Sequence, residues 1–160
     1  MSEPAGGRRL FSVLVSVVVV LIVVSTQYRN VNPSAREGRA RLANLTAQPI
    51  VSIRLEPVDF KPTIAAPIDV TDRESIAALA AALSHLPEHN PNHPHATKAV
   101  IVRIRFPDRE IGGTLQLTSN DGTTFYYMSD IENGWVFGTY LVPHGEAVFD
   151  LIAALAARPR

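Results

Sequence analysis

One uncharged, valine-rich run near the N-terminus limits most strongly what this chain can fold into. Residues 10–24 have the sequence LFSVLVSVVVVLIVV, in which two serines are the only polar side chains. A helix of roughly this length spans about 25 Å, slightly less than a bilayer core of about 30 Å. Backbone amides in lipid must be paired within the segment, so the run can cross a membrane only as a helix. We therefore predict a transmembrane helix or signal-anchor over residues 10–28, preceded by a basic tail over residues 1–9.

Two other interpretations of the run stay open. Arg8 and Arg9 before an apolar stretch also suit a cleaved signal peptide, for which Val23 and Ser25 would be a poor cleavage pair. The run could also be a buried helix of a soluble protein. The uncleaved anchor is our working hypothesis, and it makes the lipid bilayer a partner of residues 10–28.

The orientation in the membrane follows less directly, because arginines flank both sides of the run. Arg8 and Arg9 precede it, whereas Arg29, Arg36, Arg39 and Arg41 follow it. Counted strictly, the positive-inside rule places the C-terminal part in the cytoplasm. A short basic tail before a single hydrophobic segment is nonetheless the usual form of a signal-anchor, and a chain without cysteine suits an oxidising compartment. We expect a single-pass protein of a bacterial cell membrane with an extracytoplasmic domain.

Charge is divided unevenly along the chain. Residues 1–45 carry six arginines and two glutamates, net +4, whereas residues 46–160 are net −4. Arginines close to a bilayer are attracted to anionic headgroups, and an acidic domain is repelled by them. An acidic domain also argues against nucleic-acid binding, which needs a clustered basic surface. We expect a juxtamembrane linker over residues 29–48, in which residues 36–45 could form a short helix.

Segments that alternate apolar and polar side chains predict strands with one buried face. They lie at residues 51–56 and 98–106. A short strand is possible at residues 68–70, and turns lead into further strands at residues 111–118, 123–128 and 135–140. Short turns, such as those at Asn120-Asp121-Gly122 and Asn133-Gly134, join the last four strands and predict an antiparallel meander. The Gly112-Gly113 pair predicts a bulge or a close approach of the backbone.

Two segments have the periodicity of amphipathic helices. Thr71-Asp72-Arg73-Glu74 has the pattern of a capping box, which predicts that a helix begins with Thr71 as its N-cap. Apolar side chains at helical spacing follow it at Ile76, Leu79, Leu83 and Leu86, and again near the C-terminus at Val148, Leu151, Ile152 and Leu155. The order β-β-α-β-β-β-β-α predicts an α+β globular domain over residues 49–160, with both helices on one face of an antiparallel sheet.

Four of the five histidines lie within eleven residues, at His85, His89, His93 and His95. Imidazole is the commonest protein ligand for zinc, copper and nickel, so this loop over residues 85–95 could bind a divalent transition metal. The prolines among the histidines predict an extended loop, where spacing by four residues does not bring side chains together. A purely structural loop is the competing interpretation, and we assign the chain no other cofactor.

The predicted sheet also offers a docking surface for a protein partner. Aromatic side chains and arginines dominate the energetics of interfaces, and we expect Tyr126, Trp135, Tyr140, Arg103 and Arg105 to contribute to one exposed face of the sheet. The alternative is that these aromatic side chains pack against one another or under the linker.

The sequence contains no recognisable catalytic motif. Ser119, His144 and Asp150 are the residue types of a hydrolytic triad, but no serine lies in a glycine-flanked nucleophile elbow, and His144 is more simply explained as part of the turn into the last helix. We predict a membrane-anchored binding or scaffolding module that has no catalytic residues. A metal-binding domain that uses the histidine loop is the first alternative, and an enzyme without a recognisable motif is the second.

Overall fold

The computed structural model describes residues 33–91, 95–120, 122–130 and 135–158. Residues 34–160 form one compact unit, which is α+β as predicted. The predicted transmembrane helix over residues 10–28 lies outside the described residues. Within the part of the chain that the structure describes, no helix is long and apolar enough to cross a membrane.

The described strands form one antiparallel sheet in the order β2-β1-β3-β4-β5-β6, and the last four follow one another as the predicted meander. Their bounds are β1 (Ser52–Glu56), β2 (Ile68–Val70), β3 (Ala96–Arg105), β4 (Glu110–Thr118), β5 (Gly122–Asp130) and β6 (Trp135–Val142). All six predicted strands are therefore present. The predicted turn at Asn133-Gly134 lies outside the described residues.

The predicted alternation places the apolar side chains of the sheet on one face. In β3, Val100, Val102 and Ile104 are at most 1% exposed. The register pairs Ile104 with Ile53 in β1 and Val102 with Gly113 in β4, so these residues belong to the same face. We call this side of the sheet the helix face.

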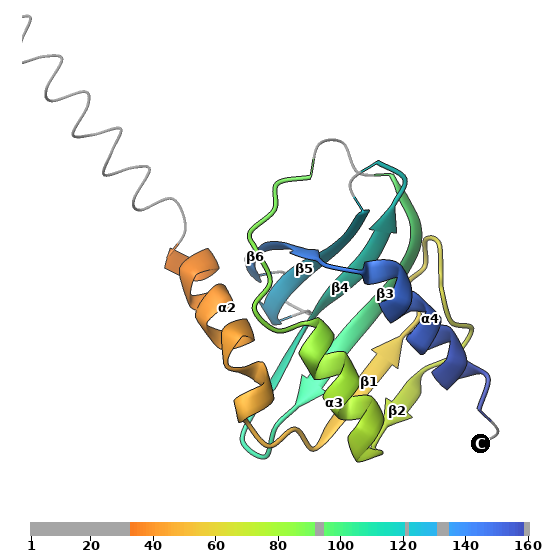
Figure 1. The fold of residues 1–160 in the computed structure, drawn as a ribbon, viewed down its shortest axis with the longest axis horizontal. Helices are drawn as coiled ribbons and strands as arrows, with labels where there is room; N and C mark the ends of the chain where they lie inside the picture. Colours follow the sequence, from red (N-terminus) through yellow and green to blue (C-terminus); the bar gives the residue numbers. More distant parts are fainter. Residues whose placement is uncertain (1–32, 92–94, 121, 131–134, 159–160) are drawn as a thin grey trace, which may run out of the picture. The chain divides into compact units, whose positions relative to one another are not determined.

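Two helices, α3 (Arg73–Ala82) and α4 (Gly145–Ala156), lie over the helix face, as Figure 1 shows. Both of the predicted apolar stripes point inward, and the most buried members are Leu79, Leu83, Ile152 and Leu155. The start of α3 corrects the predicted capping box. Asp72, not Thr71, is the N-cap, because its side chain accepts a hydrogen bond from the backbone N–H of Ser75 at 2.9 Å. This backbone hydrogen bond, more than the ion pair with Arg158, holds the pKa of Asp72 below its ordinary value.

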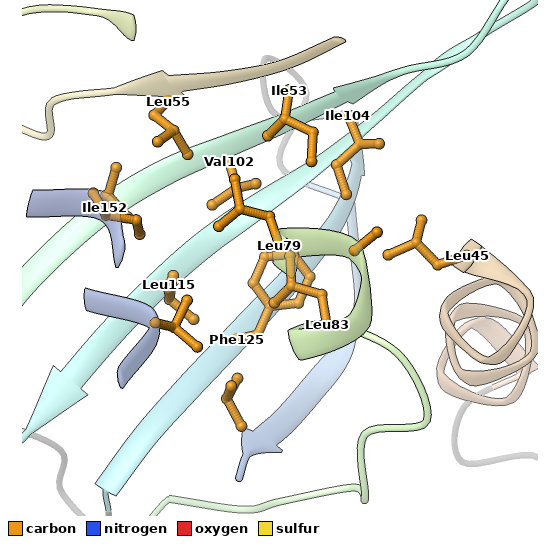
Figure 2. Close-up of a cluster of buried hydrophobic side chains, with 14 of the residues drawn as sticks. Leu45, Ile53, Leu55, Leu79, Leu83, Val102, Ile104, Leu115, Phe125 and Ile152 are labelled. Carbon is orange, nitrogen blue, oxygen red and sulfur yellow. The ribbon is translucent and has the colours of Figure 1, made fainter. Parts of the chain in front are cut away.

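The core fills the space between the helix face and the two helices. Figure 2 shows side chains from three strands, Leu55, Val102 and Leu115, gathered with Leu79 of α3 and Ile152 of α4. All five are at most 1% exposed. Burial of a leucine or isoleucine side chain stabilises a fold by about 1.5 to 3 kcal/mol, so this face is the main source of stability.

The Gly112-Gly113 pair allows a close approach but no bulge, because the β3–β4 register is uninterrupted there. A Cβ atom on Gly113 would lie 2.7 Å from the ring of Phe125 and 2.3 Å from the carbonyl oxygen of Tyr126. Glycine at this position therefore lets the buried Phe125 ring lie against the β4 backbone.

A further helix, α2 (Pro33–Ala43), and a short 3-10 helix, η1 (Leu45–Ala47), precede the sheet. Leu42 is 1% exposed and Leu45 is fully buried, so both belong to the core. A Cβ atom on Gly38 would lie 2.4 Å from the carbonyl oxygen of Phe137, which shows how closely α2 approaches β6. The segment that we expected to be a juxtamembrane linker therefore contributes two leucines to the globular unit.

The outer edge of β6 is partly covered by the segment that follows α3. The His89 N–H donates to the carbonyl oxygen of Thr139 at 2.9 Å, and the Leu141 N–H donates to the carbonyl oxygen of Pro87 at 3.0 Å. Glu88 and Tyr140 form an isolated antiparallel bridge between these two bonds. Part of the predicted histidine loop is thus paired to the sheet as a very short extra strand.

Candidate functional site

The face of the sheet opposite the helix face carries polar and charged side chains. Its residues include Ser52, Arg54, Glu56, Asp69, Arg103, Arg105, Glu110, Thr114, Gln116 and Tyr126, and we call this side the open face. None of these side chains is fully buried. Among the described helices, α3 and α4 both lie over the other face (Figure 1). The open face is therefore an ordered, mostly polar surface that α3 and α4 do not cover.

The strand register places two like charges next to each other on the open face. Arg54 in β1 lies directly opposite Arg103 in β3, and like charges directly opposite one another destabilise a sheet. Glu56 resolves the conflict, because one of its oxygens accepts from Arg54 Nε and the other from Arg103 Nε, both at 2.9 Å. One carboxylate thus bridges the two arginines.

The outer ends of both arginines bind further carboxylates. Arg54 Nη1 donates to both oxygens of Asp69, at 2.9 and 2.8 Å, and Arg103 Nη1 lies 3.5 Å from Glu110. We call Asp69, Arg54, Glu56, Arg103 and Glu110 the charged ladder. It crosses β2, β1, β3 and β4, and a network of this kind holds side chains in place better than isolated surface pairs do.

Glu56 is the most enclosed carboxylate of the charged ladder, with a side chain that is 22% exposed. Burial alone would raise its pKa. The hydrogen bonds from Arg103 and Arg54 outweigh that effect, and they hold the pKa of Glu56 below its ordinary value of 4.5. Glu56 is therefore ionised at neutral pH and keeps both arginines fixed.

Arg105 differs from the other two arginines of the open face. It lies opposite Ser52 and Glu110 in the register, yet its exposed side chain forms no ion pair with any described residue. Together with Arg54, Arg103 and others, it lines a hollow of about 340 Å³ on this face. The hollow therefore combines two guanidinium groups held by the charged ladder with one that is available to a partner.

The structure separates the predicted docking residues. Arg103, Arg105 and Tyr126 share the open face, where Tyr126 is half-buried opposite Thr114. Tyr140 does not, which corrects our expectation. It pairs with Phe125 on the helix face, is 0% exposed, and donates its hydroxyl to the carbonyl oxygen of Phe137 at 2.9 Å. Trp135 begins β6, and its side chain lies outside the described residues.

The predicted metal ligands are spread over three parts of the chain. His85 is exposed just after α3, His89 is paired to β6, and His95 is exposed just before β3. His93 lies outside the described residues. Among the residues that the structure describes, no three histidines or carboxylates come close enough to hold a metal ion. A site that includes His93 stays a prediction.

A larger hollow, of about 750 Å³, lies where the turn between β4 and β5 meets the start of α4. Ser119, His144 and Asp150 all line it. The Ser119 hydroxyl donates to the side chain of Asn120 rather than to a histidine. His144 is the N-cap of α4 in a left-handed conformation, with φ of 54°, as its expected role in the entry turn requires. These residues share a rim without the hydrogen bonds of a triad.

Sequence reasoning missed Arg54, Glu56, Asp69 and Glu110 as members of the candidate site. Arg54, Glu56 and Asp69 occupy polar positions of predicted strands, which places them on the side away from the core, whereas Glu110 lies one residue before the predicted strand 111–118. Only the strand register shows that these four residues form one network with Arg103. No protein-family model, curated protein or solved structure matches this chain.

Proposed function

We propose that this chain is a single-pass, membrane-anchored binding module whose extracytoplasmic domain docks a protein partner on the open face. The observation that carries the proposal is the open face itself: a sheet surface beyond the reach of α3 and α4, with a fixed charged ladder, an available Arg105 and a half-buried Tyr126. Preorganised charges of this kind favour specific recognition over non-specific adhesion.

The membrane part of the proposal is supported by the sequence. Residues 10–24 contain no charged side chain, and arginines flank both ends of the run. The experiment is fractionation of cells that express the full chain, together with a C-terminal alkaline phosphatase fusion. We expect the chain in the membrane fraction and an active fusion. Unprocessed full-length chain in the soluble fraction without detergent would contradict the anchor, and an inactive phosphatase fusion would contradict the orientation.

The docking part is tested by site-specific photo-crosslinking in the membrane of living cells. A photoreactive phenylalanine analogue replaces Tyr126 on the open face, and in a matched control it replaces Phe60, an aromatic residue that is 53% exposed elsewhere. We expect a discrete crosslinked product from position 126 and not from position 60. Arg105→Glu in the same chain should abolish the product. The same product from both positions, or none from position 126, would contradict docking on the open face.

A further inference from the structure

Helix α2 carries three of the six arginines that flank the predicted membrane segment. Between Pro33 and Ala43 it contains Arg36, Arg39 and Arg41 against a single acid, Glu37. Only four residues separate position 28 from Pro33, so the two positions lie at most about 18 Å apart. If residues 10–28 cross the bilayer, as proposed above, α2 begins within reach of the headgroups.

Arg39 is held by a contact that a competing anion could replace. Its Nη1 atom lies 3.2 Å from Glu88, and the two side chains are 54% and 51% exposed. An ion pair this exposed contributes little to stability. An arginine close to an anionic bilayer gains a free energy of comparable size. Glu88 and anionic headgroups are therefore evenly matched competitors for the same guanidinium.

Arg41 is held more firmly. It pairs with Glu37 one turn earlier in α2, and its guanidinium lies 5.2 Å from the centre of the Phe137 ring. The contact with Phe137 keeps Arg41 against β6, and the pair with Glu37 holds its side chain along α2. Leu42, which is 1% exposed, fixes the same end of α2 in the core. The helix can thus exchange the partner of Arg39 without leaving the domain.

We propose that α2 is a lipid-sensing surface: Arg39 binds the anionic headgroups of the bilayer, and Glu88 competes with them by holding Arg39 on the domain. This inference rests on the proposed membrane anchor and adds a ligand class to it. Charge complementarity supports it, since α2 has three arginines against one glutamate, net +2, whereas residues 46–160 are net −4. The bilayer attracts α2 and repels the rest of the domain, so α2 is the part that approaches lipid.

The test uses the full chain in lipid nanodiscs. The chain has no cysteine, so Ala40→Cys, at an exposed position of α2, gives one site for a fluorescent dye. Energy transfer to an acceptor on the lipid headgroups then reports how close α2 lies to the bilayer. We expect transfer to rise as phosphatidylglycerol replaces phosphatidylcholine, and to fall when ionic strength is raised from about 0.1 to about 1 M.

Two variants and one matched control test whether Glu88 competes with anionic headgroups for Arg39. Arg39→Gln should raise the phosphatidylglycerol fraction needed for half-maximal transfer by about fivefold. Glu88→Gln should lower that fraction by about two- to fivefold, although Glu88 does not itself bind lipid. Glu146→Gln removes the same charge from an exposed position in the first turn of α4, and we expect it to leave the fraction within about 1.5-fold of the parent chain.

The possible outcomes distinguish a failure of the membrane-anchor proposal from a failure of the lipid-sensing proposal. A chain that leaves the nanodiscs in a high-salt wash shows that the anchor is wrong, and the lipid-sensing proposal fails with it. A retained chain with equal transfer in both lipids overturns the lipid-sensing proposal alone. Equal effects of Glu88→Gln and Glu146→Gln would also overturn it, because net charge and not the Arg39–Glu88 pair would then set the response.

Discussion

The two faces of the sheet use the same strands for different purposes. On the helix face, side chains such as Leu55 and Val102 are at most 1% exposed and pack under α3 and α4. On the open face, their neighbours in sequence, Arg54 and Arg103, are 43% and 24% exposed and bind carboxylates. Burial of apolar surface contributes far more to stability than exposed ion pairs do. Substitutions on the open face should therefore cost less stability than substitutions on the helix face.

Alanine substitutions at two adjacent residues of β5 should show the largest difference in lost stability. Phe125 is 1% exposed on the helix face, and Tyr126 is half-buried on the open face. Phe125→Ala should lower the free energy of unfolding by about 3 to 5 kcal/mol, because it leaves a cavity in the core. Tyr126→Ala should cost less than half as much. Chemical denaturation of the full chain in detergent, followed by circular dichroism, measures both, and similar losses would contradict the division between the faces.

Glu56→Gln should cause an intermediate loss of stability. Loss of a charged acceptor that bridges two arginines should lower the free energy of unfolding at pH 7 by about 1 to 2 kcal/mol. The folded-state pKa of Glu56 lies below its ordinary value of 4.5, so its contribution is present above that pH and is lost as the pH falls through the folded pKa. The difference in stability between parent and variant should therefore shrink as the pH falls below 4.5 and through the folded pKa, as denaturation curves across pH can show. A difference that persists undiminished at pH 3 would contradict this role of Glu56.

The smallest effect on stability is expected at Arg105, which forms no ion pair with the described residues. Arg105→Gln should change the free energy of unfolding by less than about 0.5 kcal/mol. The same substitution should weaken the crosslinked product formed from position 126. A large loss of stability would show that Arg105 has a structural role, and would place recognition elsewhere on the open face.

Local sequence patterns predicted most of the fold. Alternation and turn residues together located all six strands, and the apolar spacing of Leu79 and Ile152 located both helices on the helix face. The N-cap of α3 was predicted one residue early, because Thr71 and Asp72 are both good caps and only the hydrogen bond to Ser75 decides between them. The packing of α2 was not predicted, since it depends on a glycine contact with the distant residue Phe137.

The candidate site was predicted less well, for two different reasons. Trp135 and Tyr140 are five residues apart, an odd separation that places them on opposite faces of a regular strand. Alternation alone could therefore have excluded one of them from the docking surface. The charged ladder could not have been found in this way, because it depends on which residue of β1 lies opposite Arg103, and no local pattern determines that register.

The ends of the sheet have a consequence for self-association. An uncovered edge strand is a template on which other chains can add strands and aggregate. Here β2 offers only the three residues Ile68–Val70, and the hydrogen bonds from His89 and to Pro87 occupy part of the β6 edge. If the proposed anchor concentrates copies in a bilayer, they would find little free backbone on one another, and side-chain surfaces would then decide what the domain binds.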